Sequence, residues 1–529
     1  MPPTEGSSEQ LPVRALLSAD CYPHEATRID LIETHISWVV LAGEFAYKIK
    51  KPVDLGFLDF TDLTRRKHYC EEEVRLNRRL APELYLDVVS LRKKDGRLLF
   101  GDDGEIIEYA VRMRRFEQAN QLDRQLQLGL LAEGDMDEIA CLIGEFHDES
   151  PSADNEDPWG TTDAIVSPAR ENFLHLGNAL RSGRRGALVE RLRDWTESRI
   201  PLLAPAFDAR KKAGRVRECH GDLHLRNMAR VNGRIVAFDG IEFDPALRWI
   251  DVISDAAFLV MDLDSRGRHD LAWRFLNGWL QATGDYESLG LLRWYLVYRH
   301  MVRAKVDAIR ISQPGTDSGE STILRDRIDA HLSLAFGETE QSSAAMLVTC
   351  GVSGSGKSWL AERLATRIPA VWARSDIERK RLFGMPPRER PSQSQVEEIY
   401  GDEASRRTYE RLVTIAKTAT AAGRWIIVDA TFLARNRRTL FLDAARQTGV
   451  PALILACEAG TSTLEDRVLT RQTRDQDPSD AGIEVLRKQL QERDPFGEDE
   501  PVMEIRTDQE TDLDELSARI RERIASAPL

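Results

Sequence analysis

The segment 220–239 carries three polar side chains whose types and spacing suit phosphoryl transfer. It begins H-G-D-L-H-L-R-N, so that Asn227 follows Asp222 by five residues, and Asp239 comes twelve residues after Asn227. One carboxylate can orient an attacking hydroxyl, while an amide and a second carboxylate can hold Mg²⁺ beside a triphosphate. Each residue alone also fits a turn, a helix cap or a strand end, but the three together favour a catalytic site.

A cation for the nucleotide phosphates is expected on an earlier strand, which contains the string Y-K-I-K-K. Because side chains alternate along a strand, Lys48 and Lys50 share one face, and either could pair with Glu72 or Glu73 of the next helix. We prefer Lys48 with Glu72 as the phosphate-orienting pair. A solvent-facing basic strand edge is the alternative.

A second phosphate-binding pattern, G-x-x-x-x-G-K-S, begins at residue 351. In this pattern backbone N–H groups wrap phosphate oxygens, the lysine reaches the outer phosphates and the serine holds Mg²⁺. The pattern follows a short apolar strand and opens a helix, which is the context that it requires. The predicted nucleotide-binding residues are Gly351, Ser353, Gly354, Ser355, Gly356, Lys357 and Ser358, and Ser358 is also a predicted metal ligand.

Five further residues of the C-terminal half could take part in transfer. Asp376 follows the expected second strand, where ligands collect in such sheets, and could accept the proton of a hydroxyl, while Arg379 shares its helix face. Asp429 ends an apolar strand and could hold Mg²⁺ through water. Arg467 and Arg471 could neutralise the transferred charge from a lid. A helix N-cap, a loop-start carboxylate and a solvated helix face are the respective alternatives.

The elements that must position these residues differ between the two halves. In the first half, alternating strings at 34–53 and 84–100 predict β-hairpins, a charged amphipathic stretch at 64–80 predicts a helix between them, and 106–112 predicts a strand. Residues 122–215 are mostly helical by periodicity. In the second half, apolar strands alternate with helices, which predicts a parallel, doubly wound sheet.

These patterns predict a chain with two principal domains. At 529 residues the chain exceeds what one core usually supports. We expect a polar arm at 1–20, a first domain at 21–335, a linker at 336–345 and a second domain at 346–529.

The composition is that of a soluble globular enzyme. Hydrophobic residues make up 42% and charged residues 30%, and the net charge of −14 argues against a general grip on nucleic acid or an anionic membrane. The six cysteines form no C-x-x-C pair, which predicts free thiols in a reducing compartment. No signal-peptide pattern and no long apolar run is present, so we predict a cytoplasmic location.

The region 34–264 resembles the aminoglycoside phosphotransferase family, which has a bilobal, protein-kinase-like fold. The pattern H-G-D-L-H-x-x-N, the downstream aspartate and the run W-I-D-V-I-S-D carry the resemblance. It implies that Asp222 is the catalytic base, that Asn227 and Asp239 bind Mg²⁺, and that Asp255 supports the catalytic loop. The nucleotide hairpin lacks the G-x-G-x-x-G of protein kinases, which leaves the use of ATP or GTP open.

The region 346–529 resembles the P-loop kinases grouped with zeta toxins, gluconate kinase and polynucleotide 5′-kinase. The motifs G-x-x-x-x-G-K-S, S-D-x-x-R and V-D-A-T-F carry this resemblance. It implies that Asp376 is the carboxylate of the acceptor hydroxyl and that Arg379 reads a phosphate. Because acceptors differ widely in this family, the resemblance implies the reaction and not the substrate.

The leading interpretation is a bifunctional kinase that uses Mg²⁺ and ATP at two sites, each phosphorylating a hydroxyl of a small molecule such as a sugar or an aminoglycoside-like alcohol. One alternative is a single active kinase domain with the other domain as a nucleotide-sensing or substrate-binding module. Another is a nucleic-acid or nucleotide-sugar kinase, which the acidic charge disfavours. The sequence leaves the acceptors and the oligomeric state open.

Overall fold

The structure is a computed structural model that describes residues 11–54, 56, 58–180, 183–313, 317–340, 343–387, 389, 392–474 and 482–527. The chain divides into two compact units, which interleave along the sequence. The first comprises Met1–Leu131, Ser150–Gly160 and Ala213–Asp255, and the second comprises Ala132–Glu149, Thr161–Lys212 and Ala256–Leu529. The predicted mixed α/β and α+β fold class, with a parallel sheet in the C-terminal part, is confirmed.

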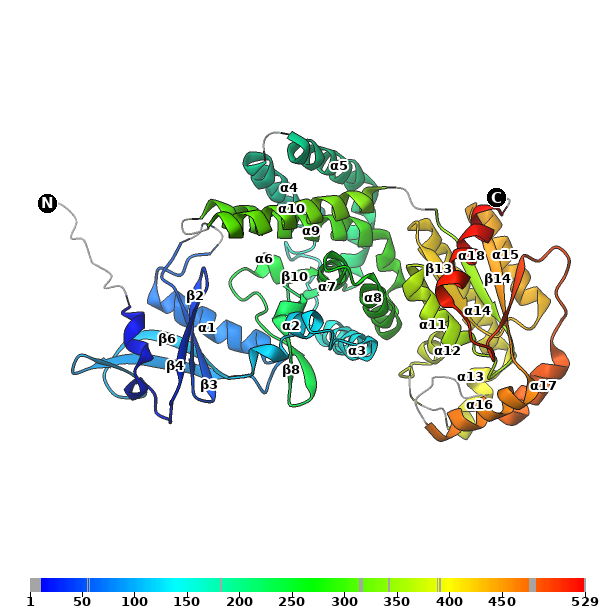
Figure 1. Cartoon of the computed structure of the whole chain (residues 1–529), viewed down its shortest axis with the longest axis horizontal. Helices are drawn as coiled ribbons and strands as arrows, with labels where there is room; N and C mark the ends of the chain where they lie inside the picture. Colours follow the sequence, from blue (N-terminus) through cyan, green and yellow to red (C-terminus); the bar gives the residue numbers. More distant parts are fainter. Residues whose placement is uncertain are drawn as a thin grey trace. The chain divides into compact units, whose positions relative to one another are not determined.

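The first unit is built on a six-stranded antiparallel sheet with the order β1-β2-β3-β6-β4-β5 (Figure 1). The strands are β1 (Ile29–Glu33), β2 (Ser37–Ala42), β3 (Phe45–Lys50), β4 (Tyr85–Lys94), β5 (Arg97–Phe100) and β6 (Glu105–Arg114). Both predicted hairpins are therefore present. In the β2–β3 pair Lys48 lies opposite Val39 and Lys50 opposite Ser37, so the two lysines point to the same face of the sheet.

Helix α1 (Leu63–Asn77) packs on this sheet. It begins where the Asp62 side chain accepts hydrogen bonds from two N–H groups of the first turn, a strong N-cap. Its buried Cys70 and Val74 pack against Tyr85 and Val111 of the sheet. This packing turns the face that carries Glu73 towards the interior, where that side chain is fully buried.

The catalytic motif lies in a group of short elements of the first unit. These are β7 (Val216–Glu218), the 3₁₀ turn η4 (Leu225–Asn227), β8 (Met228–Val231), β9 (Arg234–Ala237), α6 (Pro245–Arg248) and β10 (Trp249–Asp251). β8 and β9 form a hairpin whose turn residues, Asn232 and Gly233, both have positive φ, as an Asn-Gly turn requires. β7 pairs antiparallel with β10, so the motif leaves the end of a paired strand.

The remaining short elements of the first unit are the 3₁₀ turns η1 (Val13–Leu17), η2 (Ala19–Cys21) and η3 (Gln118–Asn120) and the helix α2 (Leu122–Gln127). The predicted arm at 1–20 therefore contains a 3₁₀ turn in its described part. Leu16 of that turn is fully buried in a core cluster with Val40 and Tyr47.

Helices dominate the N-terminal part of the second unit. They are α3 (Glu133–Glu149), α4 (Thr162–Ala179), α5 (Gly183–Lys212), α7 (Val252–Ser265), which begins in the first unit, α8 (His269–Thr283), the 3₁₀ turn η5 (Tyr286–Ser288), α9 (Leu289–Ser312) and α10 (Ser318–Thr339). α9 and α10 lie side by side (Figure 1). Their core contains Val297, Met301 and Leu332. Within the described residues, none of the helices is both long and apolar enough to cross a membrane.

The C-terminal part of the second unit contains a five-stranded, wholly parallel sheet with the order β12-β13-β11-β14-β15. The strands are β11 (Met346–Cys350), β12 (Ala370–Arg374), β13 (Trp425–Asp429), β14 (Ala452–Glu458) and β15 (Val502–Arg506). The helices that connect and follow them are α11 (Lys357–Arg367), α12 (Ser375–Leu382), α13 (Gln393–Tyr400), α14 (Asp402–Ala421), α15 (Arg435–Thr448), α16 (Thr461–Arg474), α17 (Ile483–Glu492) and α18 (Leu513–Ala525). This is the predicted doubly wound arrangement.

α11 and α18 pack together over the sheet. Leu360 and Leu364 of α11 and Ile520 of α18 share a core cluster with Leu347 of β11 and Ile427 of β13, and all five side chains are fully buried. Because β11 lies in the middle of the sheet, the loop that follows it opens between neighbouring strands. That position at the carboxyl ends of parallel strands is where such sheets bind ligands.

The edge strand β12 is covered by side-chain amides of α8. Asn277 Oδ1 accepts from Trp372 N–H (2.7 Å), and Asn277 Nδ2 donates to Ala370 O (2.9 Å). One turn later Gln281 Nε2 donates to Trp372 O (3.1 Å). The two amides therefore take the place of a neighbouring strand, and they protect an edge that would otherwise leave backbone groups unpaired.

The predicted linker at 336–345 overlaps the end of α10, and its residues 341–342 lie outside the described part of the chain. Residues 1–10 of the predicted arm lie outside it as well. The domain bounds at 20, 335 and 345 stay predictions.

Candidate active sites

The catalytic loop of the first unit holds Asp222 by local hydrogen bonds. Asn227 Nδ2 donates to Asp222 Oδ2 (2.9 Å) and to Asp222 O (3.1 Å), and His224 Nε2 lies 3.3 Å from Oδ2. The Asp222 side chain is about one-third exposed, at 34%. The carboxylate that the sequence predicted as a base is thus held by local contacts and is partly open to solvent.

Asp255 supports this loop by accepting two of its backbone N–H groups, as the sequence resemblance implied. Its Oδ1 accepts from Gly221 N–H (2.9 Å) and its Oδ2 from His220 N–H (3.1 Å), and the side chain is fully buried. Gly221 has φ +85°, and a Cβ there would lie 2.7 Å from Leu247 O, so the loop requires glycine at this point. The result is a tight turn that presents Asp222.

His220 connects the catalytic loop with the segment that carries Asp239. Its Nε2 lies 3.0 Å from Phe238 O, and its Nδ1 accepts from Asp222 N–H (3.3 Å). Because a carbonyl can only accept, Nε2 carries the proton and the neutral ring leaves Nδ1 free to accept. Burial lowers the pKa of His220, which favours this neutral form.

The backbone around Asp239 is fixed from two other elements. Asp239 has φ +62°, and its N–H donates to Tyr85 Oη (3.1 Å). The next residue, Gly240, donates its N–H to Asn77 Oδ1 (2.8 Å), and Asn77 Nδ2 donates in turn to Glu73 O (2.9 Å). Asn77 of α1 therefore fixes the position of the Asp239 segment relative to α1.

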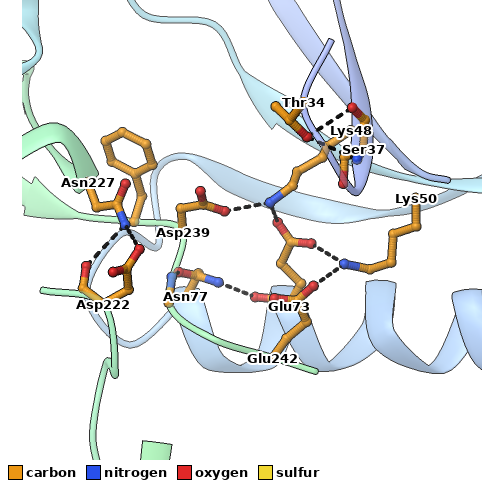
Figure 2. A network of polar contacts seen from close by, with 12 residues as sticks. Thr34, Ser37, Lys48, Lys50, Glu73, Asn77, Asp222, Asn227, Asp239 and Glu242 are labelled. Atoms are coloured by element: carbon orange, nitrogen blue, oxygen red, sulfur yellow. Dashed lines mark hydrogen bonds and ion pairs between the residues drawn. The ribbon is translucent and has the colours of Figure 1, made fainter. Parts of the chain in front are cut away.

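Two lysines share the carboxylate of Glu73 (Figure 2). Lys48 Nζ donates to Glu73 Oε1 (2.7 Å), and Lys50 Nζ donates to Glu73 Oε2 (2.8 Å). Lys48 Nζ also contacts Asp239 Oδ1. The preferred partner of the sequence prediction was wrong: Glu72 pairs instead with Arg75 (2.8 Å), because α1 turns Glu73 and not Glu72 towards β3.

The ionisation states of Glu73 and Lys48 depend on the charges that surround each of them. Burial alone would raise the pKa of Glu73, but the two ammonium groups lower it to about 2. Burial alone would lower the pKa of Lys48, but the carboxylates of Asp239 and Glu73 raise it well above its usual value. Both groups are therefore ionised at neutral pH.

The first site brings together the residues that the sequence predicted for it, except Glu72. Figure 2 shows Asp222 and Asn227 on one side of Asp239 and Lys48 on the other. Carboxylate and amide oxygens are the ligands that Mg²⁺ prefers, so the donor set fits this ion. The arrangement can hold a metal-bound phosphate between a lysine and a partly exposed carboxylate.

The P-loop of the second unit runs from β11 to α11 and depends on glycines. Gly354 and Gly356 have φ near +80°, and a Cβ at Gly354 would lie 2.8 Å from Leu464 O. Lys357 and Ser358 start α11, and Ser355 is buried inside the loop. The predicted motif thus forms a loop of backbone amides at a helix N-terminus, the arrangement that binds phosphate.

Lys357 and the two carboxylates that the sequence predicted for this site, Asp376 and Asp429, lie on elements of one parallel sheet. Lys357 Nζ donates to Val352 O (2.8 Å), within the loop. Burial lowers the pKa of Lys357, while the carboxylates of Asp429 and Asp376 oppose that effect. Asp429 and Asp376 lie at the carboxyl ends of the neighbouring parallel strands β13 and β12. Asp429 ends β13 and accepts from Thr349 Oγ1 (3.3 Å). The structure therefore gathers the lysine and the two predicted carboxylates at one edge of the sheet.

The predicted acceptor-side pair is divided. Asp376 lies in the first turn of α12, directly after β12, and is half-buried. Arg379 turns towards α13 and α14, where its Nη1 donates to Ile399 O (3.0 Å) and Ser405 Oγ (3.3 Å). In this arrangement Arg379 joins α12 to the neighbouring helices, and its role in reading a phosphate stays a prediction.

Arg467 of α16 contacts the P-loop. Its Nη1 donates to Thr507 Oγ1 (3.1 Å) and lies 3.3 Å from Gly354 O, and its Nη2 donates to Thr507 O (2.7 Å). Thr507 Oγ1 donates in turn to Ser355 O (2.7 Å). The side chain of Arg471, predicted for the same lid, lies outside the described part of the chain.

The sequence prediction missed Gln489. This residue lies on α17, and its Oε1 accepts from Ser353 N–H of the P-loop (2.7 Å). Leu486 of the same helix packs on Val352 and Val468. One backbone N–H group of the P-loop therefore donates to a neutral side-chain amide oxygen. The amphipathic spacing of α17 could have indicated the packing, but no local pattern indicates the contact between Gln489 and the loop.

Comparison with known sequences identifies relatives over most of the chain. Residues 346–496 match the family AAA_33, described as an AAA domain. An uncharacterized protein of Mycobacterium tuberculosis (strain ATCC 25618 / H37Rv), Rv2004c, is 30% identical over 454 residues, which cover 85% of this chain and 88% of the relative. An uncharacterized protein of Mycobacterium bovis, Mb2027c, gives the same values.

Comparison with solved structures finds several kinases among the similar structures. The amicoumacin kinase hAmiN, in complex with AMP-PNP, Ca²⁺ and Ami, is 13% identical, with a TM-score of 0.38, over 61% of this chain and 92% of its own. A sugar kinase from Janibacter sp. HTCC2649 is 18% identical, with a TM-score of 0.26, over 35% of this chain and 96% of its own. The match of residues 346–496 to AAA_33 agrees with the predicted resemblance of the C-terminal region to P-loop proteins.

Proposed function

The chain belongs to the family of the uncharacterized mycobacterial protein Rv2004c, and we propose that it is an ATP-dependent phosphotransferase with two active sites. Each site transfers the γ-phosphate of ATP to a hydroxyl group of a small molecule. The observation that supports this proposal is that two unrelated phosphate-handling arrangements occur on one chain, each with its own lysine and its own carboxylates.

At the first site, Asp222 is the general base. Its carboxylate, which is partly exposed, orients the acceptor hydroxyl and takes its proton, while Asn227 holds Oδ2 in place. Lys48, oriented by Glu73, binds the nucleotide phosphates. Asn227 and Asp239 would hold Mg²⁺, which neutralises the charge of the phosphates when it is bound.

At the second site, the P-loop amides and Lys357 hold the triphosphate, and Ser358 and Asp429 would hold Mg²⁺. Asp376 orients the acceptor hydroxyl and takes its proton, since it follows β12 at the ligand-binding edge of the sheet. Arg467, which contacts the loop from α16, adds positive charge where the phosphoryl group is transferred.

The proposed acceptors are small hydroxyl compounds and not nucleic acid. The net charge of −14 opposes binding of a polyanion, whose affinity depends on a broad positive surface. The proposed location is the cytoplasm, where Mg²⁺ and ATP are available. ATP is proposed for both sites, with GTP as an alternative at the first.

The test is to incubate the wild-type protein, Asp222→Ala and Lys357→Ala with Mg-ATP and a fractionated metabolite extract, and to follow new phosphorylated species by mass spectrometry. Two products, each lost in only one variant, would support two kinases and would identify both acceptors. One product lost in a single variant would leave the other part as a nucleotide-sensing or substrate-binding module. No product with any fraction would contradict the proposal.

A further inference from the structure

The first site contains a second buried lysine that its proposed chemistry does not use. Lys50 is fully buried, and its Nζ donates to Glu73 Oε2 (2.8 Å) and contacts Glu242 Oε1. Glu242 is only 4% exposed. The Lys50 ammonium also lies 5.1 Å from the ring centre of Phe60, whose side chain is fully buried. Figure 2 shows Lys50 on the opposite side of Glu73 from Asp222, with Glu242 below Glu73.

A buried ion pair of this kind is not explained by stability alone. Removing two charges from water costs several kcal/mol per ion, and apolar side chains of the same volume often stabilise a fold as well or better. Burial raises the pKa of Glu242, and Lys50 only partly offsets that effect. The buried pair of Lys50 and Glu242 therefore lowers the free energy of folding less than apolar side chains would. Its geometry indicates a role other than stability.

The contacts form two parallel connections between β3 and the segment 239–242. Lys48 joins β3 to Asp239, and Lys50, two residues further along the strand, joins it to Glu242. Glu73 of α1 lies between the lysines and bonds to both. Three elements that are far apart in the sequence, β3, α1 and the segment with the predicted metal ligand, are thus held at one point.

We propose that Lys50 and Glu242 are positioning residues of the first site, an inference that rests on the proposed function. Lys50 fixes one oxygen of Glu73 and neutralises Glu242, so the other oxygen of Glu73 orients Lys48, and Lys48 stays available to the phosphates. Glu242 fixes the segment that carries Asp239 at the correct distance from β3. Neither residue contacts the nucleotide; both act through Lys48 and Asp239.

The charge count determines what each substitution does. Lys48 and Lys50 carry two positive charges against three negative ones on Glu73, Glu242 and Asp239. Lys50→Met leaves one lysine among three carboxylates, so Lys48 is drawn to the uncompensated pair and withheld from the phosphates. Adding Glu242→Gln removes the uncompensated charge and releases Lys48 again. The double variant should therefore bind nucleotide better than the single variant.

The test measures equilibrium binding of Mg·AMP-PNP to the full chain in a Lys357→Ala background, which silences the second site. We expect Lys50→Met to weaken binding by about 10- to 100-fold, the size of effect seen when a residue that orients a metal ligand is removed. We expect the double variant Lys50→Met/Glu242→Gln to recover to within about threefold of the background. Lys51→Met is the matched control: Lys51 pairs with the exposed carboxylate of Glu33 (2.6 Å), which is not part of the proposed site, and this variant should bind normally.

Thermal unfolding of each variant separates positioning from support of the fold. A lower melting temperature with an unchanged dissociation constant for Lys50→Met would overturn the inference, as would a double variant that binds as weakly as the single one. If Lys50→Met does not fold, the charge-balanced double variant and Glu242→Gln carry the test, and normal binding by Glu242→Gln would overturn the role of Glu242. If the Lys357→Ala background itself binds no nucleotide, the proposed function of the first site fails, and that result is distinct from the others.

Discussion

Replacing Asp255 with asparagine should loosen the catalytic loop of the first site. Asp255 is fully buried, and its two oxygens accept from His220 N–H (3.1 Å) and Gly221 N–H (2.9 Å). An asparagine of the same shape offers only one oxygen. Its NH₂ group therefore faces a backbone donor, and one buried N–H group loses its partner.

The magnitude follows from those two bonds. A hydrogen bond to a charged group contributes about 1.5–3 kcal/mol, and a buried donor without a partner costs about 1–3 kcal/mol. We expect Asp255→Asn to lower the free energy that holds the loop closed by about 3 kcal/mol, and Asp255→Ala by about 3–6 kcal/mol. A loss of about 3 kcal/mol corresponds to roughly a 100-fold faster local opening.

Hydrogen exchange followed by mass spectrometry measures this opening directly at the amides of residues 219–223. Because Asp222 follows Gly221, displacement of the loop by about 1 Å should also reduce turnover at the first site by about 100-fold, with the second site unaffected. Asp244→Asn is the matched control: Asp244 is an N-cap that accepts from Ala246 N–H (2.8 Å) at an exposed position, and asparagine caps a helix equally well.

Two results would refute this reasoning. If Asp255→Asn exchanges at the wild-type rate, the carboxylate does not hold the loop. If exchange accelerates while turnover at the first site is unchanged, the position of Asp222 does not depend on this support.

Three further predictions concern the second unit. Gln489→Leu should tighten ATP binding at the second site by about fivefold, because phosphate no longer displaces a side chain from Ser353 N–H; calorimetry that shows weaker binding would indicate that Gln489 supports the loop. Asn277→Leu should lower the free energy of unfolding by about 2–6 kcal/mol, since two buried backbone groups of β12 lose their partners; an unchanged urea midpoint would contradict the proposed cover of the edge. His300 and His331 are hydrogen-bonded at 3.1 Å, and burial lowers the pKa of His331 to about 4 and that of His300 well below its usual value. Below about pH 6.5 the unfolded chain binds protons on these histidines and the folded chain does not. The free energy of unfolding should therefore be highest above that pH and fall by about 2 kcal/mol per histidine by pH 5. His331→Gln should reduce the dependence of this free energy on pH, and an unchanged dependence would show that other groups bind the protons.

The parts of both sites that are close in sequence could be predicted without the fold. Asp222 and Asn227 are five residues apart and bond to each other, and Lys357 and Ser358 start the helix that their motif requires. In each case backbone geometry over a few residues fixes where the side chains lie. The strand period likewise placed Lys48 and Lys50 on one face, and alternating strands and helices indicated the parallel sheet.

The direction in which a helix faces was not determined by local pattern. Glu72 and Glu73 are neighbours on α1, and a helix turns about 100° per residue, so only one can face β3. The packing of Cys70 and Val74 on the sheet and the bond from Asn77 to Gly240 determine that it is Glu73. Tertiary packing also decides where Arg379 points. Its spacing from Asp376 places both on one helix face, but the Arg379 side chain donates to groups of α13 and α14, which pack near α12.

The sequence by itself determined the local motifs of the two candidate sites and the parallel sheet of the C-terminal part, because those features depend on short-range geometry. Only the tertiary structure decided the contacts of Glu242 with Lys50, of Gln489 with the P-loop and of Asn277 with β12. These partners are separated by about 90 to 190 residues. A hydrogen bond at such separation depends on how whole elements pack, and no spacing within a single element encodes it.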